Sequence, residues 1–210
     1  MLSSKTHTFW LWTLLLCALT GCLIKFGIFE GTLRLYQIRY FTNLSNLIGG
    51  IYALLALTAP KADLRGLRGM AVLALSVTAV VYHAVLAAVF GSYIPLTLGW
   101  WGNLLVHTVT PALMVGEWLA FRKERPLRWY HPFIWLGFPA AYLAVTVLIA
   151  KLGVLLPNSD TPYPYPFLDV WKLGWTAVLR NVVVMGAGFL ALGYLLVGLD
   201  TLRHKREKSW

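Results

Sequence analysis

Residues 38–58 read IRYFTNLSNLIGGIYALLALT, an apolar stretch whose first half carries several polar side chains. About 20 residues are needed to cross the ~30 Å hydrocarbon layer of a bilayer, and this stretch is long enough. A lone segment in lipid satisfies its backbone only as a helix. Five further stretches share this character, so the sequence predicts an all-α integral membrane protein with six transmembrane helices in a single bundle. The predicted spans are residues 9–29, 38–58, 68–90, 98–121, 132–152 and 177–198.

The composition supports a membrane protein with no separate soluble domain. The 210 residues are 59% hydrophobic and 12% charged, whereas soluble domains are about 25% charged. The formal net charge of +10 does not predict nucleic-acid binding, because the basic residues lie in short loops beside apolar spans, where they set topology. We therefore treat residues 1–210 as one transmembrane domain whose partner is the lipid bilayer.

The distribution of basic residues predicts the orientation. With the N-terminus, the second and fourth loops and the C-terminus on one side, that side carries twice as many basic residues as the other, so both termini are predicted to be cytoplasmic. Residues 199–210 then form a basic cytoplasmic tail at the lipid headgroups. Lys5 precedes the first apolar stretch as in a signal peptide, but no cleavage site follows and a membrane helix is predicted. The basic residues predicted outside are Lys25, Arg34, Arg39, Lys151, Lys172 and Arg180.

Polar side chains at the start of the second span form one helical stripe. Thr42, Ser45, Asn46 and Gly49 follow the i, i+3, i+4, i+7 spacing of a single helix face. Because unpaired polar groups are costly in hydrocarbon, this face is expected to line the interior of the bundle or a cavity.

Two histidines on neighbouring spans could complete a reactive site with this stripe. His83 and His107 lie on the third and fourth spans at a depth similar to that of Thr42. A hydroxyl and an imidazole are the minimum parts of a nucleophile–base pair, so Thr42 is a candidate nucleophile and His107 a candidate base. Pro111 cannot donate to the carbonyl of His107, and the helix is expected to bend there with that acceptor free.

Other polar residues have candidate supporting roles, each with a structural alternative. Acyl transfer needs donors to a developing oxyanion, and Asn43, Asn46 and Asn103 could supply them; interhelical hydrogen bonding is the alternative for each. His83 could orient the pair or be a satisfied interior histidine. Arg180 could bind the carboxylate of an acidic lipid, with Lys172 and Lys151 as weaker candidates, or it could pair with Asp169.

The order of these motifs resembles a known family. YFTNLSNL at residues 40–47, His107-Thr108 with Pro111 downstream, and YPFLDV at residues 165–170 occur in this order on six spans. This is similar to the androgen-induced and androgen-dependent family of intramembrane threonine hydrolases, in particular its prokaryotic branch. The resemblance implies a hydrolase of fatty acid esters of hydroxy fatty acids, with Thr42 as nucleophile and His107 as base. It also implies a bacterial inner membrane protein that needs no cofactor.

Two other functions remain open from the sequence. His83 and His107, on adjacent spans, could ligate a b-type haem, or the chain could be a quinone protein. A non-catalytic lipid or small-molecule carrier would use Arg180, Asn103 and the aromatic loop of residues 153–176 for binding. No metal site is predicted, because the remaining histidines fall at the other side of the membrane and Cys17 and Cys22 lie on different helix faces.

Overall fold

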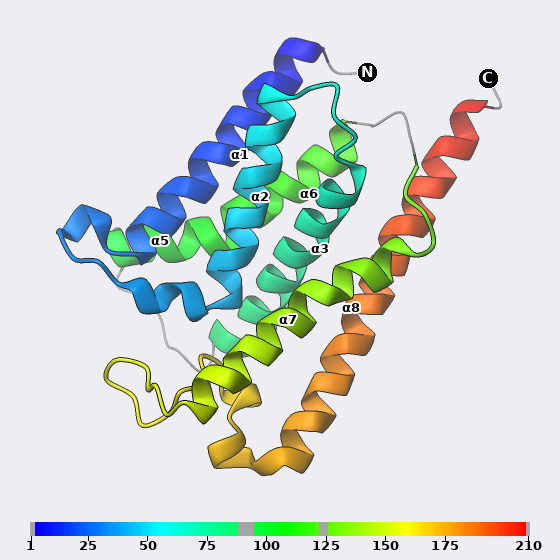
Figure 1. Ribbon diagram of the computed structural model, residues 1–210. Coiled ribbons are helices and arrows are strands. Elements are labelled where there is room, and N and C mark those ends of the chain that lie inside the picture. Colours follow the sequence, from blue (N-terminus) through cyan, green and yellow to red (C-terminus); the bar gives the residue numbers. More distant parts are fainter. Residues whose placement is uncertain (1–2, 88–94, 122–125, 209–210) are drawn as a thin grey trace. The chain divides into compact units, whose positions relative to one another are not determined.

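The computed structural model describes residues 3–87, 95–121 and 126–208, with side chains as far as Lys205. Within these ranges every regular element is helical (Figure 1). Five of the described helices are long and apolar enough to cross a membrane, and each overlaps a predicted span. They are Ser4–Lys25, Phe41–Thr58, Arg65–Leu86, His131–Lys151 and Val170–Lys205. The predicted end of the third span and the basic residues Arg122, Lys123 and Arg125 lie outside the described residues.

The segment predicted as the fourth span is helical in three pieces. It consists of α5 (Leu98–Leu104), a π-helical turn η4 (Leu105–Val109) and α6 (Thr110–Ala120). In η4 the N–H of Thr110 donates to the carbonyl of Leu105, five residues back, and the next residue, Pro111, has no N–H. The distortion therefore falls at the proline, as the sequence predicts.

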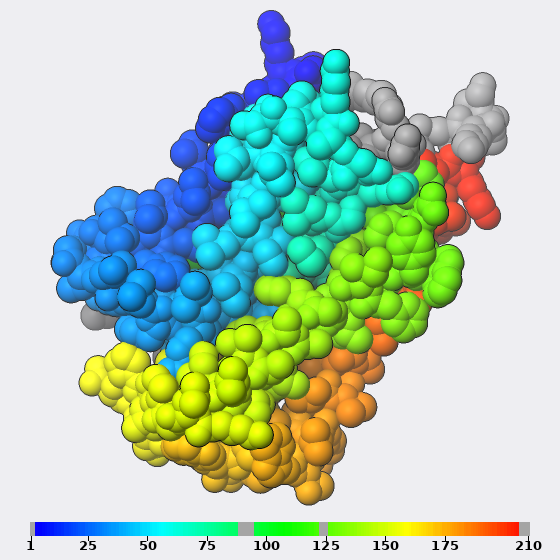
Figure 2. All heavy atoms as spheres, viewed as in Figure 1, coloured from blue at the N-terminus to red at the C-terminus, as the bar shows by residue number. Residues whose placement is uncertain are grey.

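The residue contacts divide the chain into two compact units, residues 1–127 and 128–210, which we describe separately. Unit 1 contains α1 (Ser4–Lys25), α2 (Phe41–Thr58), α3 (Arg65–Val81), the π-helical turn η3 (Tyr82–Leu86) and the segment α5–η4–α6. Helix α1 packs on α2, α5 and α6, and α3 packs on α2 and α6. The blue ribbon of α1 and the light-blue to cyan ribbon of α2 lie side by side in Figure 1, and their atoms adjoin in Figure 2.

Two glycines let α1 approach the α5–η4 segment closely. A Cβ atom at Gly21 would lie 3.0 Å from Cβ of Leu105, and one at Gly102 would lie 2.6 Å from Cγ2 of Ile24. Small residues at such contacts allow helix backbones to pack tightly in membranes. This packing fixes the position of η4, which carries His107.

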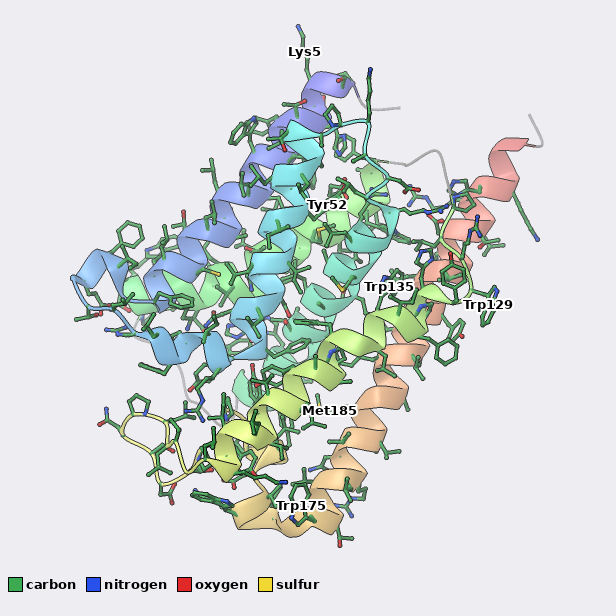
Figure 3. The ribbon with its side chains drawn as sticks, in the orientation of Figure 1. Lys5, Tyr52, Trp129, Trp135, Trp175 and Met185 are labelled. Carbon is green, nitrogen blue, oxygen red and sulfur yellow. The ribbon has the colours of Figure 1, made fainter. Side chains whose placement is uncertain are left out.

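A buried charged cluster joins four helices of unit 1. Glu117 of α6 is fully buried. It accepts hydrogen bonds from Arg68 of α3 (Nε–Oε2, 2.8 Å) and Tyr52 of α2 (2.7 Å), and its Oε1 lies 2.9 Å from Nε2 of His7 of α1. Figure 3 shows Tyr52 within this unit, between the ribbons of α2 and α6. The sequence suggested a structural charge beside Arg122 and Lys123; the structure identifies Arg68 as an ion-pair partner.

Unit 2 consists of α7 (His131–Lys151), a long loop with the short 3-10 helix η5 (Pro166–Leu168), and α8 (Val170–Lys208). Gly174 has non-helical angles (φ 74°, ψ 162°) and interrupts α8 near its start. The rings of Tyr165 and Phe167 stack with centroids 5.3 Å apart. Because α8 continues to Lys208, the predicted basic tail forms the last turns of this helix.

Candidate active site

Thr42 and His107 are in contact within unit 1. Oγ1 of Thr42, the second residue of α2, lies 3.3 Å from Nε2 of His107 in η4. The two side chains are buried, with 7% and 9% of their surface exposed. The separation is at the long end for a hydrogen bond, as often occurs at catalytic pairs without substrate. The sequence permitted this contact through depth and helix face, and the structure provides it.

The other imidazole nitrogen determines which tautomer faces the threonine. Nδ1 of His107 lies 3.1 Å from the main-chain carbonyl oxygen of Asn103, one turn earlier. A carbonyl oxygen only accepts, so Nδ1 carries the proton and Nε2 of the neutral ring presents its lone pair. The hydroxyl of Thr42 then donates to Nε2, which is the arrangement of a nucleophile with its general base.

Tyr82, which the sequence analysis did not select, holds the plane of the His107 ring. The two rings stack with centroids 3.9 Å apart and an interplanar angle of 18°. The Tyr82 hydroxyl accepts a hydrogen bond from Nδ2 of Asn103. The hydrogen bonds at Nδ1 and Nε2 fix the line through the two nitrogens, and the stacked ring limits rotation about that line. Asn103 therefore orients His107 through its carbonyl and through Tyr82.

Beside His107, two π-helical turns, η3 and η4, contact each other. Tyr82 of η3 stacks on His107, and the next residue, His83, places Nε2 3.0 Å from Oγ1 of Thr108. His83 thus contacts Thr108 and not the hydroxyl of Thr42. Single π-helical turns inside α-helices are uncommon and often occur at functional sites, and here two such turns face each other.

The polar side chains that follow Thr42 mostly donate hydrogen bonds to main-chain carbonyl oxygens. Nδ2 of Asn46 donates to the carbonyls of Thr42 (2.8 Å) and Val106 (3.0 Å), and this uses both amide hydrogens. Nδ2 of Asn43 donates to the main-chain and side-chain oxygens of Gln37. Ser45 donates to the carbonyl of Phe41. Asn46 therefore links α2 to η4 beside the Thr42–His107 pair, and neither asparagine has an amide hydrogen left for an oxyanion.

Next to the π-helical turn, the carbonyl of Val106 accepts a side-chain hydrogen bond from Asn46. The free acceptor that the sequence predicts is the neighbouring carbonyl, that of His107, and this stays a prediction. The π-helical turn shifts the pattern, because the N–H of Thr110 is used by Leu105 and Pro111 has none to offer.

A lysine lies beside this cluster. Nζ of Lys25, the last residue of α1, lies 3.4 Å from Oδ1 of Asn103. From the sequence, Lys25 indicates only the topology, because a basic residue at the end of a membrane span usually contacts the lipid headgroups. The structure adds it to the polar groups around His107.

The candidate residues of unit 2 have local contacts of their own. Asp169 accepts hydrogen bonds from the main-chain N–H groups of Trp171 and Lys172 and caps the start of α8. Arg180 is exposed on α8. Lys172 pairs with Asp160 at 3.0 Å, and its hydrogen bond lowers the pKa of that exposed carboxyl.

The residues around the histidines do not fit haem ligation. A ligating imidazole needs a free nitrogen toward the iron, whereas both nitrogens of His107 have partners and Nε2 of His83 is bonded to Thr108. Across the described ranges, no three His, Cys, Asp or Glu side chains form a group that could hold a metal ion.

Comparisons of the chain with protein-family models, with curated proteins and with solved structures find no match. The geometry of the site is therefore the basis for a functional proposal.

Proposed function

We propose that this protein is an intramembrane lipid-ester hydrolase that uses Thr42 as nucleophile and His107 as general base. The observation that carries the proposal is the buried contact between Thr42 Oγ1 and His107 Nε2, with Nδ1 held by a carbonyl. A threonine hydroxyl is a weak nucleophile until a neighbouring base takes its proton. The substrate class that we propose is a fatty acid ester of a hydroxy fatty acid.

The reaction has two steps. Oγ1 of Thr42 attacks the ester carbonyl carbon while Nε2 of His107 takes the hydroxyl proton, and the ring then gives that proton to the departing alkoxide. The products of this step are the alcohol and an acyl ester on Thr42. In the second step Nε2 of His107 takes a proton from water and the hydroxide attacks the acyl carbon. The ring then returns this proton to the departing alkoxide of Thr42, so that the acid is released and free Thr42 and neutral His107 are regenerated.

The positive end of α2 is suited to the charge that develops in both steps. Thr42 is the second residue of this helix, where the helix dipole favours negative charge. Asn103 donates one amide hydrogen to Tyr82 and has a second. We propose these groups as the electrostatic stabilisation of the oxyanion, in place of Asn43 and Asn46.

We further propose that α5–η4–α6 is a sixth span and that both termini are cytoplasmic in a bacterial inner membrane. The asymmetry of the basic residues supports this orientation. Thr42 and His107 then lie in the outer leaflet, where a lipid ester reaches them from the bilayer.

A covalent probe tests the proposal. Purified protein in detergent is treated with a fluorophosphonate, and the labelled residue is located by mass spectrometry. We expect labelling at Thr42 and its loss in His107→Ala, because the base is needed to activate the hydroxyl. Unlabelled Thr42 in folded protein that binds a fatty acid ester without product would instead indicate a lipid carrier.

Lys25 is expected to select substrates that carry a negative group. Its ammonium lies at the edge of the site beside Asn103, and a cation attracts a carboxylate. We expect Lys25→Met to raise KM about tenfold for an ester with a free carboxylate, a difference of about 1.4 kcal/mol. The methyl ester of the same substrate is the matched control, for which KM should be unchanged. An equal rise in KM for both substrates would contradict this role.

A further inference from the structure

Three buried oxygens of unit 1 have no hydrogen-bond partner. Among the described residues, the buried side-chain atoms without a partner are Oδ1 of Asn46, Oγ1 of Thr78, Oγ1 of Thr110 and, in unit 2, Nε2 of His204. Asn46 and Thr110 are fully buried, and Thr78 has 5% of its surface exposed. Leaving a buried polar group without a hydrogen bond is costly. Three such oxygens in one unit therefore indicate a bound molecule.

The two threonines differ from other hydroxyl residues on helices of this chain. Thr8, Thr13, Thr58 and Ser45 each donate to the carbonyl four residues back, the usual way for a helical hydroxyl to be satisfied. Thr78 and Thr110 do not. Their hydroxyl groups are directed elsewhere although both residues are buried.

Asn46 bonds the carbonyl that lies four residues before Thr110. The carbonyl four residues before Thr110 belongs to Val106, and it accepts the side chain of Asn46 at 3.0 Å. A helical threonine at position 110 would ordinarily donate its hydroxyl to this carbonyl, and Nδ2 of Asn46 donates to it instead. The amide of Asn46 therefore lies against the turn that carries Thr110.

Helix geometry places Thr78 of α3 on the face that is turned toward Asn46 of α2. A Cβ atom at Gly49 would lie 2.8 Å from Cδ1 of Leu75, so these residues face each other across α2 and α3. The two helices are antiparallel neighbours. One turn from this contact toward Thr42, the same helix faces carry Asn46 on α2 and Thr78 on α3, because residues three apart share a face.

We propose that Asn46, Thr78 and Thr110 bind an internal water molecule, and that this water is the one consumed in the second step of the reaction. The chemistry fits, because Oδ1 of Asn46 only accepts hydrogen bonds, whereas a threonine hydroxyl both donates and accepts. Buried waters typically make about three hydrogen bonds to polar groups that would otherwise be unsatisfied.

The position suits the second step, and this part of the inference rests on the proposed function. The acyl ester on Thr42 is broken by water, which is scarce inside an apolar bundle. Asn46 bonds the carbonyl of Thr42 itself at 2.8 Å and that of Val106, the neighbour of His107. A water on Oδ1 of Asn46 therefore lies behind the catalytic pair, within the bundle.

The water is tested directly by X-ray radiolytic labelling in detergent, which oxidises side chains next to bound water. Met114 is fully buried and follows Thr110 by one turn, so it serves as the reporter. We expect oxidation of Met114 in the wild type and at least a threefold loss in the double variant Thr78→Val, Thr110→Val. Thr13→Val, which removes a hydroxyl already bonded to a carbonyl, is the control. Equal oxidation of Met114 in all three proteins would overturn the site.

The role in the reaction is tested by separating its two steps. We expect the double variant to form the acyl ester at the wild-type rate and to hydrolyse it more slowly by about tenfold to a hundredfold, the scale of a misplaced reactant. Equal hydrolysis rates would overturn the catalytic part of the proposal. If the wild type forms no acyl ester, the proposed function fails, while the oxidation of Met114 still decides whether the water is bound.

Discussion

Thr42→Ala is expected to lower kcat/KM for a fatty acid ester by about 10⁴-fold or more under the proposed mechanism, as removal of a nucleophile does in known hydrolases. Without the hydroxyl no acyl ester can form, and the imidazole of His107 has only water to activate. Residual catalysis would come from binding and from the oxyanion donors alone. The measurement is steady-state hydrolysis of a chromogenic long-chain ester in detergent micelles.

The fold should survive this substitution, which makes the experiment interpretable. Thr42 is buried near the start of α2, and the carbonyl that accepts Asn46 belongs to its main chain, so alanine retains that link. Thr42→Ser is the matched variant, since it keeps an oxygen at the same position, and it should retain measurable turnover. Wild-type turnover by Thr42→Ala would contradict the mechanism, and circular dichroism would show whether a loss reflects unfolding.

The sequence predicts the pair better than its surroundings. Helix periodicity and approximate depth permit Thr42 and His107 to face each other, because both depend on regular helix geometry, and the contact itself comes from the structure. Tyr82 and Lys25 were not identified as site residues from the sequence, because their contacts depend on irregular backbone geometry. Tyr82 stacks on His107 from a π-helical turn, and Lys25, the last residue of α1, contacts the side chain of Asn103. The 3.6-residue periodicity of an α-helix predicts neither of these contacts.

The proline of the fourth span illustrates the same limit. Pro111 predicts a break in the hydrogen bonds, and the structure has one there. The sequence does not reveal that the helix forms a wider, π-helical turn there, or that Asn46 bonds the carbonyl of Val106 in this turn. The missing N–H of Pro111 thus predicts where the helix is distorted, whereas the π-helical form of the distortion comes from the structure.

The fold itself should depend most on Glu117. We expect Glu117→Leu to lower the free energy of unfolding by about 3–5 kcal/mol, because it leaves the buried guanidinium of Arg68 without its counter-charge. The same change removes the acceptor of Tyr52 and the partner of His7, so four helices lose a common contact. The measurement is unfolding in mixed detergent micelles, followed by circular dichroism.

Two controls separate the loss of pairing from the loss of a side chain. Glu30→Leu breaks the half-exposed Arg34–Glu30 pair of the same unit and should cost less than about 1 kcal/mol. The double variant Arg68→Met, Glu117→Leu removes both buried charges and should recover most of the stability, because paired buried charges are often replaceable by apolar side chains. A Glu117→Leu protein no less stable than Glu30→Leu would contradict this account.

The Glu117 cluster should also be separable from catalysis. In α1, His7 precedes Lys25 by 18 residues, or about 27 Å of helix, so the charged cluster and the Thr42–His107 site lie toward opposite ends of unit 1. The double variant should therefore keep kcat per folded molecule close to that of the wild type, although Glu117→Leu alone loses activity in proportion to its unfolded fraction. A folded double variant without activity would mean that this cluster positions η4, and the stability and kinetic measurements together distinguish the two cases.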